Sequence, residues 1–459
     1  MITMKLPRIM LVATSSESGK TLITCGILQA LVNRKLNVSS FKCGPDFIDP
    51  LFHGKVIGTK SSNLDSFFVE PNTLRYLFGN SATGSDISVI EGVMGFYDGI
   101  DVLSMKASSY EISNILNIPV ILIVDCQGAS STIAATVKGL KEFRPNNIKG
   151  IILNRISLSI YDEIKDLIES EMNVKVLGHV PNVKELILES RHLGLVLPSE
   201  ISSLKKKLVE LANVLEKSLD LDLFIKIANT AEDLSCEEPK FPVLDEKLRI
   251  AVAADDAFCF TYKDNLKILE KMGAEIVEMS PIHNKELPAD IDGLIFSGGY
   301  PELHAKELSE NNSMKKDIFN KISKGIPCIA ECGGFMYLNR TIEDQTGKKY
   351  EMVNVLNGNC FRTDRLVRFG YISIKSTSDQ FILKENDIIK GHEFHYWDCT
   401  DNGNGCIASE IRKKGEYTCM YGTSRIFAGF PHLYYYSNPN VPYNFLCKCL
   451  EYKKERQCK

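Results

Sequence analysis

A chain of 459 residues with 44% hydrophobic and 24% charged residues has the composition of a globular protein with two or three well-filled domains. Its formal net charge of −4 excludes a basic footprint for nucleic acid and a polybasic membrane patch, so we expect small-molecule partners. The fourteen cysteines are scattered without a C-x-x-C pair, which argues against zinc or disulfide scaffolds and favours reduced thiols in the cytoplasm. The longest apolar run, 118–124, is too short to span a bilayer.

The first half of the chain alternates short apolar runs with helix-length segments, which is typical of an open parallel sheet. The runs that read as buried strands are 8–14, 38–42, 87–92, 120–126, 150–156 and 176–181. Ligands of such sheets gather at the carboxyl ends of the strands. Polar residues that directly follow these runs are therefore the first candidates for function.

A charge-rich helical stretch with a proline-containing tail, 201–245, reads as a linker, and a second alternation begins after it. The strand-like runs of this second half are 248–254, 274–280, 293–299 and 326–332. The sequence thus predicts an α/β protein of two domains, a doubly wound parallel sheet over 1–200 and a flavodoxin-like sheet over 246–459.

The stretch "ATSSESGKT" (13–21) lies between the first strand and the first helix. There, backbone N–H groups around Gly19 would surround phosphates, Lys20 would reach the β/γ oxygens and the Thr21 hydroxyl would bind Mg²⁺. Thr14 stands where the usual first glycine of a phosphate loop is found. The alternative, a serine-rich helix cap, leaves Lys20 unexplained, so the stretch predicts a nucleotide site.

Acidic residues follow two further strands, in "KCGPDFIDP" (42–50) and "IEGVMGFYDG" (90–99). Mg²⁺ prefers a few carboxylates together with phosphate and water oxygens, so these residues suit a metal site beside the phosphates. Turn chemistry is the alternative, because Asp49-Pro50 and Asp98-Gly99 are common turn sequences. Glu91, at the end of a buried strand, is the hardest of them to explain structurally.

In the second half, "CIAECGGFMYL" (328–338) reads as strand, sharp turn and helix, with Cys332 at the turn. A cysteine at the positive end of a helix, close to backbone N–H groups, is favoured as a thiolate nucleophile. The glycines of "SGGYPELH" (297–304) follow the preceding strand and can turn an N–H toward an oxyanion. We expect the other thirteen cysteines to pack as small hydrophobic residues.

The general base for Cys332 must come from another segment. His432 in "FAGFPHLYYYSNP" follows a short apolar strand of the same half, while His392 and His395 in "GHEFHYW" are rivals. Most lone histidines are structural, and only its position after a strand favours His432.

Long motifs in a fixed order then make the chain resemble the cobyrinic acid a,c-diamide synthase family over nearly its whole length. The motifs are SGKT (18–21), FKCGPDFIDP (41–50), NLDSFF (63–68), IEGVMGFYDG (90–99), GIILNRI (150–156), RHLGLVLPSE (191–200), AFCFTYKDNLKILEKMGAEIVEMSP (257–281), SGGYPELHAKELSEN (297–311), AECGGFMYL (330–338), GHEFHYW (391–397) and HLYYYSNP (432–439). The family joins a dethiobiotin-synthetase-like ATP domain to a class I-type glutamine amidotransferase domain. The resemblance implies ATP and L-glutamine as co-substrates, Mg²⁺ as cofactor and the carboxylates of a corrinoid tetrapyrrole as acceptors.

The resemblance also assigns roles to residues. In the first domain it implies an ATP site formed by Ser18, Gly19, Lys20, Thr21 and Asn154, and a metal site formed by Thr21, Asp46 and Glu91. It also implies a substrate loop that contains Asp46, Phe47 and Asp49. In the second domain it implies that Cys332 and His432 are catalytic and that Gly299 and Gly333 form an oxyanion hole. Asn154 would contact adenine, with a strand-ending turn residue as the alternative. Asp46 is open to either a metal or a substrate role.

Tyr434 departs from the family pattern. Class I amidotransferases commonly carry a glutamate two residues after the histidine base, and Tyr434 occupies that place, so a third member of the catalytic group is unassigned. Three alternatives stay open at the level of sequence: nickel sirohydrochlorin as acceptor, hydrogenobyrinic acid as acceptor, or a nucleotide switch fused to an inert amidotransferase-like module. The sequence also leaves open whether the protein forms a homodimer.

Overall fold

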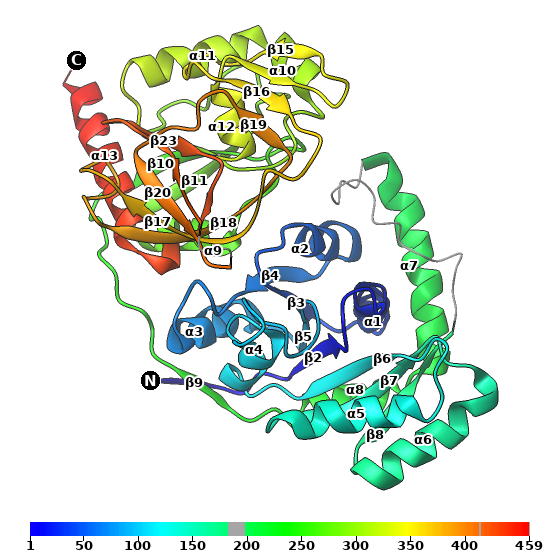
Figure 1. Ribbon diagram of the computed structural model, residues 1–459. Coiled ribbons are helices and arrows are strands. Elements are labelled where there is room, and N and C mark those ends of the chain that lie inside the picture. The colour runs from blue at the N-terminus through cyan, green and yellow to red at the C-terminus, as the bar shows by residue number, and fades with distance from the viewer. Residues whose placement is uncertain (182–197, 413–414, 459) are drawn as a thin grey trace. The chain divides into compact units, whose positions relative to one another are not determined.

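The computed structural model describes residues 1–181, 198–412 and 415–458, with the backbone alone for 198–202, and divides them into two compact units, Met1–Pro239 and Lys240–Lys459 (Figure 1). The helices of the segment predicted as a linker belong to the first unit. The first seven residues of the motif RHLGLVLPSE lie outside the described residues. The limits predicted for the domains stay a prediction.

The first unit is built on a seven-stranded parallel sheet in the order β4-β3-β5-β2-β6-β7-β8. Its strands are β2 (Arg8–Ala13), β3 (Val38–Cys43), β4 (Lys60–Leu64), β5 (Ile87–Glu91), β6 (Val120–Asp125), β7 (Ile148–Asn154) and β8 (Lys175–Val180). Every residue of β2 is buried, which explains its continuous apolar run. From β2 the chain continues to β3 on one side of the sheet, and from β6 it continues to β7 on the other side. Ligands of such sheets bind at the carboxyl ends of the strands where this direction changes.

Helices cover the faces of this sheet. They are α1 (Lys20–Asn33), α2 (Ile48–Phe52), the π-helix η1 (His53–Ile57), α3 (Pro71–Ala82), α4 (Ser109–Ile115), α5 (Thr132–Phe143), α6 (Leu158–Met172), α7 (Pro198–Ser218) and α8 (Leu221–Ala228). Helix α7 runs beside α1 (Figure 1). Gly26 of α1 permits this packing, because a Cβ there would lie 2.5 Å from Leu215 Cδ1.

Local contacts fix the ends of this unit. The first strand, β1 (Ile2–Met4), pairs antiparallel with β9 (Leu234–Cys236), and the N-terminus lies beside β9 in Figure 1.

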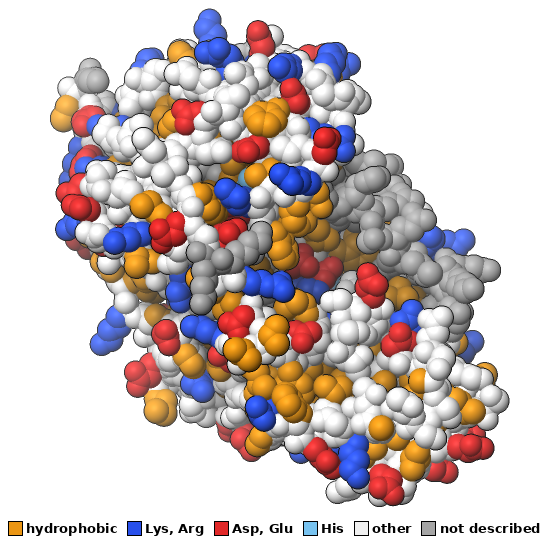
Figure 2. Space-filling model, viewed as in Figure 1, with side chains coloured by type: hydrophobic (Ala, Val, Ile, Leu, Met, Phe, Trp, Pro, Cys, Tyr) orange, Lys and Arg blue, Asp and Glu red, His pale blue; other side chains and the backbone are white. Residues whose placement is uncertain are grey.

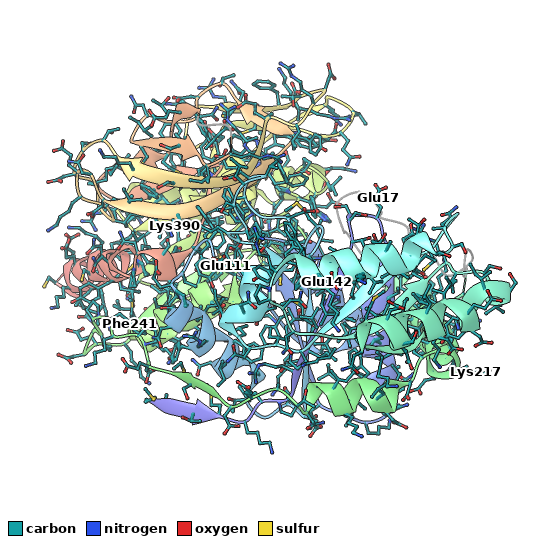
Figure 3. The ribbon with its side chains drawn as sticks, turned by 60° about the horizontal axis from the view of Figure 1, so that its bottom comes forward. Glu17, Glu111, Glu142, Lys217, Phe241 and Lys390 are labelled. Carbon is teal, nitrogen blue, oxygen red and sulfur yellow. The ribbon has the colours of Figure 1, made fainter. Side chains whose placement is uncertain are left out.

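Glu111, labelled on α4 in Figure 3, accepts the Ala107 N–H at 2.7 Å, while the Ser108 hydroxyl accepts the Glu111 N–H at 3.1 Å. These two contacts satisfy backbone donors at the start of α4.

The second unit is built on a six-stranded sheet in the order β11-β10-β12-β13-β23-β22, parallel except for its last strand. The strands are β10 (Leu248–Ala253), β11 (Ala274–Met279), β12 (Gly293–Phe296), β13 (Cys328–Glu331), β22 (Tyr421–Gly422) and β23 (Ile426–Gly429). Its helices are α9 (Lys263–Lys271), α10 (Ala305–Glu310), α11 (Asn312–Ser323), α12 (Gly333–Leu338) and α13 (Asn440–Gln457), with a 3-10 turn η4 (Tyr435–Ser437). The predicted fold class is confirmed.

Two further sheets complete the second unit, the first antiparallel and the second mixed, with β14 and β16 parallel. One has the order β21-β20-β17-β18-β24 and contains β17 (Arg368–Ser376), β18 (Ile388–His395), β20 (Cys406–Glu410), β21 (Glu416–Cys419) and β24 (His432–Leu433). The other has the order β15-β14-β16-β19 and contains β14 (Thr341–Glu343), β15 (Lys349–Glu351), β16 (Asn359–Arg362) and β19 (Trp397–Cys399). Strand β24 pairs with β18, so His432 lies directly opposite His392.

Acidic and basic side chains are interspersed on the face shown in Figure 2. None of the helices within 1–181, 198–412 and 415–458 is both long enough and apolar enough to cross a membrane.

Candidate active site

The loop after β2 has the geometry of a phosphate loop. It runs through Glu17, which is labelled in Figure 3 and has a positive φ of 61°, to Gly19, whose φ of 85° precedes the first residue of α1. Asn154 Nδ2, at the end of β7, donates to Ser18 O at 2.9 Å. A Cβ on Gly19 would lie 2.4 Å from the same nitrogen, so the glycine provides both the backbone conformation and the space.

The side chains that open α1 point toward the ends of neighbouring strands. Lys20 Nζ donates to Met94 O at 2.7 Å, and Thr21 Oγ1 donates to Glu91 Oε1 at 2.6 Å. Burial lowers the pKa of Lys20, although the nearby Glu91 opposes this effect. Lys20 forms no ion pair with the residues that the structure describes, so this buried lysine is suited to receive phosphate oxygens.

Lys42, at the end of β3, connects the acidic residues of this site. Its Nζ lies 2.8 Å from Glu91 Oε1 and 4.0 Å from Asp46 Oδ2, and it also donates to Asp49. Burial raises the pKa of Asp46 to about 6, whereas Lys42 lowers the pKa of Asp49 against the effect of burial. Phe47 is buried at the start of α2 between these two aspartates. The structure thus brings Thr21, Asp46, Asp49 and Glu91 together.

The donor set at this position fits a magnesium ion. Thr21, Asp46 and Glu91 supply hard oxygen atoms, and Glu91 Oε2 is buried with no hydrogen-bond partner among the described residues. That oxygen lies 3.7 Å from His53 Nε2. No group of three or more His, Cys, Asp or Glu side chains forms a metal cage in the part of the chain that the structure describes. A site of few protein ligands, completed by phosphate and water oxygens, is the pattern that Mg²⁺ favours.

Cys332 lies at a strained turn between β13 and α12. Its φ of 48° and ψ of −107° are unusual for a residue with a side chain, and its N–H donates to Gly429 O at 2.8 Å. Strain of this kind holds a nucleophile at an elbow between strand and helix. Burial, followed by the negative charge of Glu302, raises the pKa of the Cys332 thiol, while the Gly333 N–H lowers it.

The two glycines predicted for the oxyanion hole lie beside this turn. A Cβ on Gly333 would be 3.1 Å from Gly299 N, which shows how closely the two backbones approach. Gly299 has a φ of 155°, and a Cβ there would collide with Ala257 O at 2.1 Å. Backbone N–H groups so close to Cys332 can donate hydrogen bonds to an oxygen atom that develops negative charge.

His432 is the first residue of β24 and follows by three residues the carboxyl end of β23, the strand that neighbours β13. Its ring stacks on His392 with centroids 4.9 Å apart, and its Nδ1 lies 4.0 Å from Glu331 Oε2. Burial and the nearby His395 lower the pKa of His432 to about 3. Cys332 and His432 thus lie just beyond the ends of adjacent strands, as expected for a nucleophile and its base.

The rival histidines have other contacts. His392 Nδ1 lies 3.0 Å from Tyr262 Oη, while His395 Nδ1 lies 2.6 Å from Trp397 O. His395 Nε2 lies 3.7 Å from Glu393 Oε2, and that carboxylate accepts the Tyr417 hydroxyl. These contacts favour structural or supporting roles for both rings.

Sequence reasoning missed two residues of these sites. Lys42 is the penultimate residue of the buried strand β3, and Glu331 ends the buried strand β13 immediately before Cys332. A charged side chain at or next to the end of a buried strand is the signal that could have identified both.

Two family models match the chain. The "CobQ/CobB/MinD/ParA nucleotide binding domain" matches residues 9–196, and the "CobB/CobQ-like glutamine amidotransferase domain" matches residues 249–440. The first match includes the phosphate loop, and the second includes Cys332 and His432.

Several curated relatives match over almost the full length of the chain, and each is named "Cobyrinate a,c-diamide synthase". The relative from Thermoplasma volcanium is 38% identical, with 99% of this chain and all of that protein covered. The relative from Caldanaerobacter subterraneus is 37% identical, and the one from Picrophilus torridus is 40% identical, with 97% of this chain and 99% of the relative covered in both comparisons.

Proposed function

The chain belongs to the cobyrinate a,c-diamide synthase family, and on that premise we propose that it converts the a and c carboxylates of cobyrinic acid to amides. The reaction uses ATP and glutamine, so the protein is a glutamine-hydrolysing carbon–nitrogen ligase. The observation that carries the proposal is that one chain combines a phosphate loop at Lys20 with a cysteine elbow at Cys332.

In the glutamine half-reaction, the Cys332 sulfur attacks the side-chain amide carbon of glutamine while His432 takes up the thiol proton. The Gly299 and Gly333 N–H groups stabilise the negative oxygen of the tetrahedral intermediate. His432 then gives its proton to the departing nitrogen, ammonia leaves, and water hydrolyses the remaining thioester. The raised pKa of Cys332 makes this coupled proton transfer necessary, because the resting residue is a thiol.

In the ATP half-reaction, Lys20 neutralises the phosphate oxygens while the γ-phosphoryl group moves to a corrinoid carboxylate. The acyl phosphate that results is attacked by ammonia, and phosphate leaves as the amide forms. Thr21, Asp46 and Glu91 would hold Mg²⁺, which supplies positive charge to the phosphates when bound. Asn154 fixes the phosphate loop through Ser18 O, and we assign it the adenine contact as well.

The loop from Asp46 to Asp49 suits the approach of the acceptor carboxylate. Lys42 holds Asp49 there, and the Asp46 carboxylate accepts the Ile48 N–H at 2.7 Å. A second passage through the same steps at another side chain would give the diamide.

The test is a comparison of acceptors. The purified protein is incubated with ATP, glutamine and Mg²⁺, separately with cobyrinic acid, hydrogenobyrinic acid or nickel sirohydrochlorin, and the products are analysed by mass spectrometry. We expect two amides on cobyrinic acid. Diamidation of another tetrapyrrole alone would change the acceptor and leave the reaction intact, whereas glutamine hydrolysis without any amidation would refute the tetrapyrrole assignment.

A further inference from the structure

Glu331, the last residue of β13, and His432, the first residue of β24, lie close together. Glu331 Oε2 lies 4.0 Å from His432 Nδ1, and the two side chains are only 8% and 3% exposed. From this separation, a shift of about 1 Å would bring the two groups within hydrogen-bond range, as catalytic groups often do on binding substrate.

The fold specifies this contact. Glu331 ends β13 opposite Gly429 of β23, and the Leu433 N–H donates to the Glu331 carboxylate. A Cβ on Gly298 would lie 2.2 Å from His432 Cε1, so the absence of a side chain at Gly298 leaves room for the imidazole. The fold thus places this ring against a glycine and brings the Glu331 carboxylate near its Nδ1.

In class I amidotransferases the acid that pairs with the histidine lies two residues after it. In this chain Tyr434 occupies that position and makes a different contact. Tyr434 donates its hydroxyl to Asp264 Oδ2 at 3.2 Å, and Asp264 also lies 3.7 Å from Lys267. The residue two places after His432 is thus engaged with α9 through Asp264. Glu331 approaches the same histidine from the strand that carries the nucleophile.

We propose that Glu331 is the positioning residue for His432, filling the place of the acid that position 434 lacks. This inference rests on the proposed glutaminase function. The Glu331 carboxylate accepts the Nδ1–H of His432, which leaves Nε2 free to take the proton from Cys332 Sγ. The proton then passes from Nε2 to the departing ammonia. The Glu331 carboxylate stabilises the imidazolium that forms when His432 takes up this proton.

Burial disfavours the charged form of both groups. Burial raises the pKa of Glu331 to about 8 and, together with His395, lowers the pKa of His432 to about 3. Burial therefore opposes each charge in isolation. A buried charge becomes tolerable when an opposite charge lies beside it, so the imidazolium that forms during the reaction needs Glu331.

The test measures glutamine hydrolysis and ammonia-dependent amidation separately, in the full-length protein. Glu331→Gln keeps the size of the side chain and removes its charge. We expect its kcat for glutamine to fall by about 100-fold or more, as when an orienting carboxylate is lost from a catalytic triad, with KM within about threefold of wild type. Amidation with added ammonia should keep its rate, and Glu331→Asp should recover part of the lost kcat.

The matched control is Tyr434→Phe, which removes the contact with Asp264 and keeps the buried ring. We expect its kcat for glutamine to stay within about threefold of wild type, because the ring still packs. Wild-type kcat in Glu331→Gln, or an equal loss in Tyr434→Phe, would overturn the inference, as would an equal loss of ammonia-dependent amidation. Failure of the wild type itself to hydrolyse glutamine would refute the proposed function instead.

Discussion

The Thr21 hydroxyl donates to Glu91 Oε1 across 2.6 Å, and this contact joins the first turn of α1 to the carboxyl end of β5. Two of the three residues that we assign to the metal are therefore already oriented toward each other. Lys42 lies 2.8 Å from the same oxygen and offsets its charge. On the proposed assignment, this arrangement would place Thr21 and Glu91 ready to bind a cation beside the phosphates.

Glu91→Gln tests this arrangement. The substitution keeps an oxygen for Thr21 and removes the charge, so we expect ATP-dependent amidation to fall by about 100-fold or more, in line with the loss of a metal ligand. Hydrolysis of glutamine should stay within about twofold, since the Cys332 site does not use Glu91. Thr21→Ser keeps a hydroxyl and serves as the control. Wild-type amidation by Glu91→Gln would contradict the metal assignment.

Gly19→Ala should weaken ATP binding. A Cβ on Gly19 would collide with Asn154 Nδ2 at 2.4 Å, and the φ of 85° adds a cost of roughly 1–2 kcal/mol for a residue with a side chain. We expect the KM for ATP to rise by about tenfold or more. Gly139→Ala in α5 is the control, because nothing lies within 4 Å of a Cβ there. An unchanged KM for ATP in Gly19→Ala would count against the loop geometry.

Alkylation of Cys332 should depend on pH in a defined direction. Burial and Glu302 raise the pKa of this thiol above its ordinary value of 9.0, so the residue is protonated at neutral pH. The thiolate fraction grows as the pH rises toward the raised pKa, and labelling by iodoacetamide without glutamine should accelerate above pH 9. Mass mapping follows the rate, with exposed Cys458 as the internal reference for reagent access. Fast labelling of Cys332 at pH 7, with no further acceleration at higher pH, would contradict the raised pKa of this thiol.

Arg8 should be important for the stability of the first unit. Its guanidinium is fully buried and donates to the carbonyl oxygens of Leu6, Leu116, Asn117 and Glu232. Arg8→Met leaves these acceptors unsatisfied, so we expect the free energy of unfolding to fall by about 3 kcal/mol. Calorimetry would report this as a drop of roughly 6–12 °C in the Tm of that unit.

Arg34→Met is the control for Arg8. Arg34 pairs with Glu216 and Asp222 near the surface, where ion pairs contribute about 0–1 kcal/mol. Equal Tm values for Arg8→Met and Arg34→Met would contradict the role assigned to Arg8.

The sequence predicted the parallel sheets well, because strands buried on both faces leave continuous apolar runs. The expected run 120–126 corresponds to β6 (Val120–Asp125), and the expected run 248–254 corresponds to β10 (Leu248–Ala253). The two smaller sheets of the second unit were not predicted. Their residues mix buried and half-exposed positions, as in β17, so no continuous apolar run marks them.

The candidate sites were predicted only where the local chain defines the chemistry. Lys20 and Cys332 follow from a strand, a turn and a helix that are consecutive in sequence. The contacts of Lys42 with Glu91, and of Glu331 with His432, join residues that are far apart along the chain. The pairing of β3 with β5, and of β13 with the β23 strand that precedes His432, brings these residues close together. No local sequence pattern could therefore have specified the two contacts.

The central claim is that glutamine hydrolysed at Cys332 supplies the nitrogen that the ATP site attaches to the corrinoid. Its most direct test follows the isotope label in product formed from cobyrinic acid, ATP and amide-¹⁵N glutamine by the wild type and by Cys332→Ala, the variant with and without unlabelled ammonia. We predict ¹⁵N in both new amides of the wild-type product, no product from the variant with glutamine alone, and an unlabelled diamide when ammonia is added. Labelled diamide from Cys332→Ala, or unlabelled diamide from the wild type, would contradict the claim.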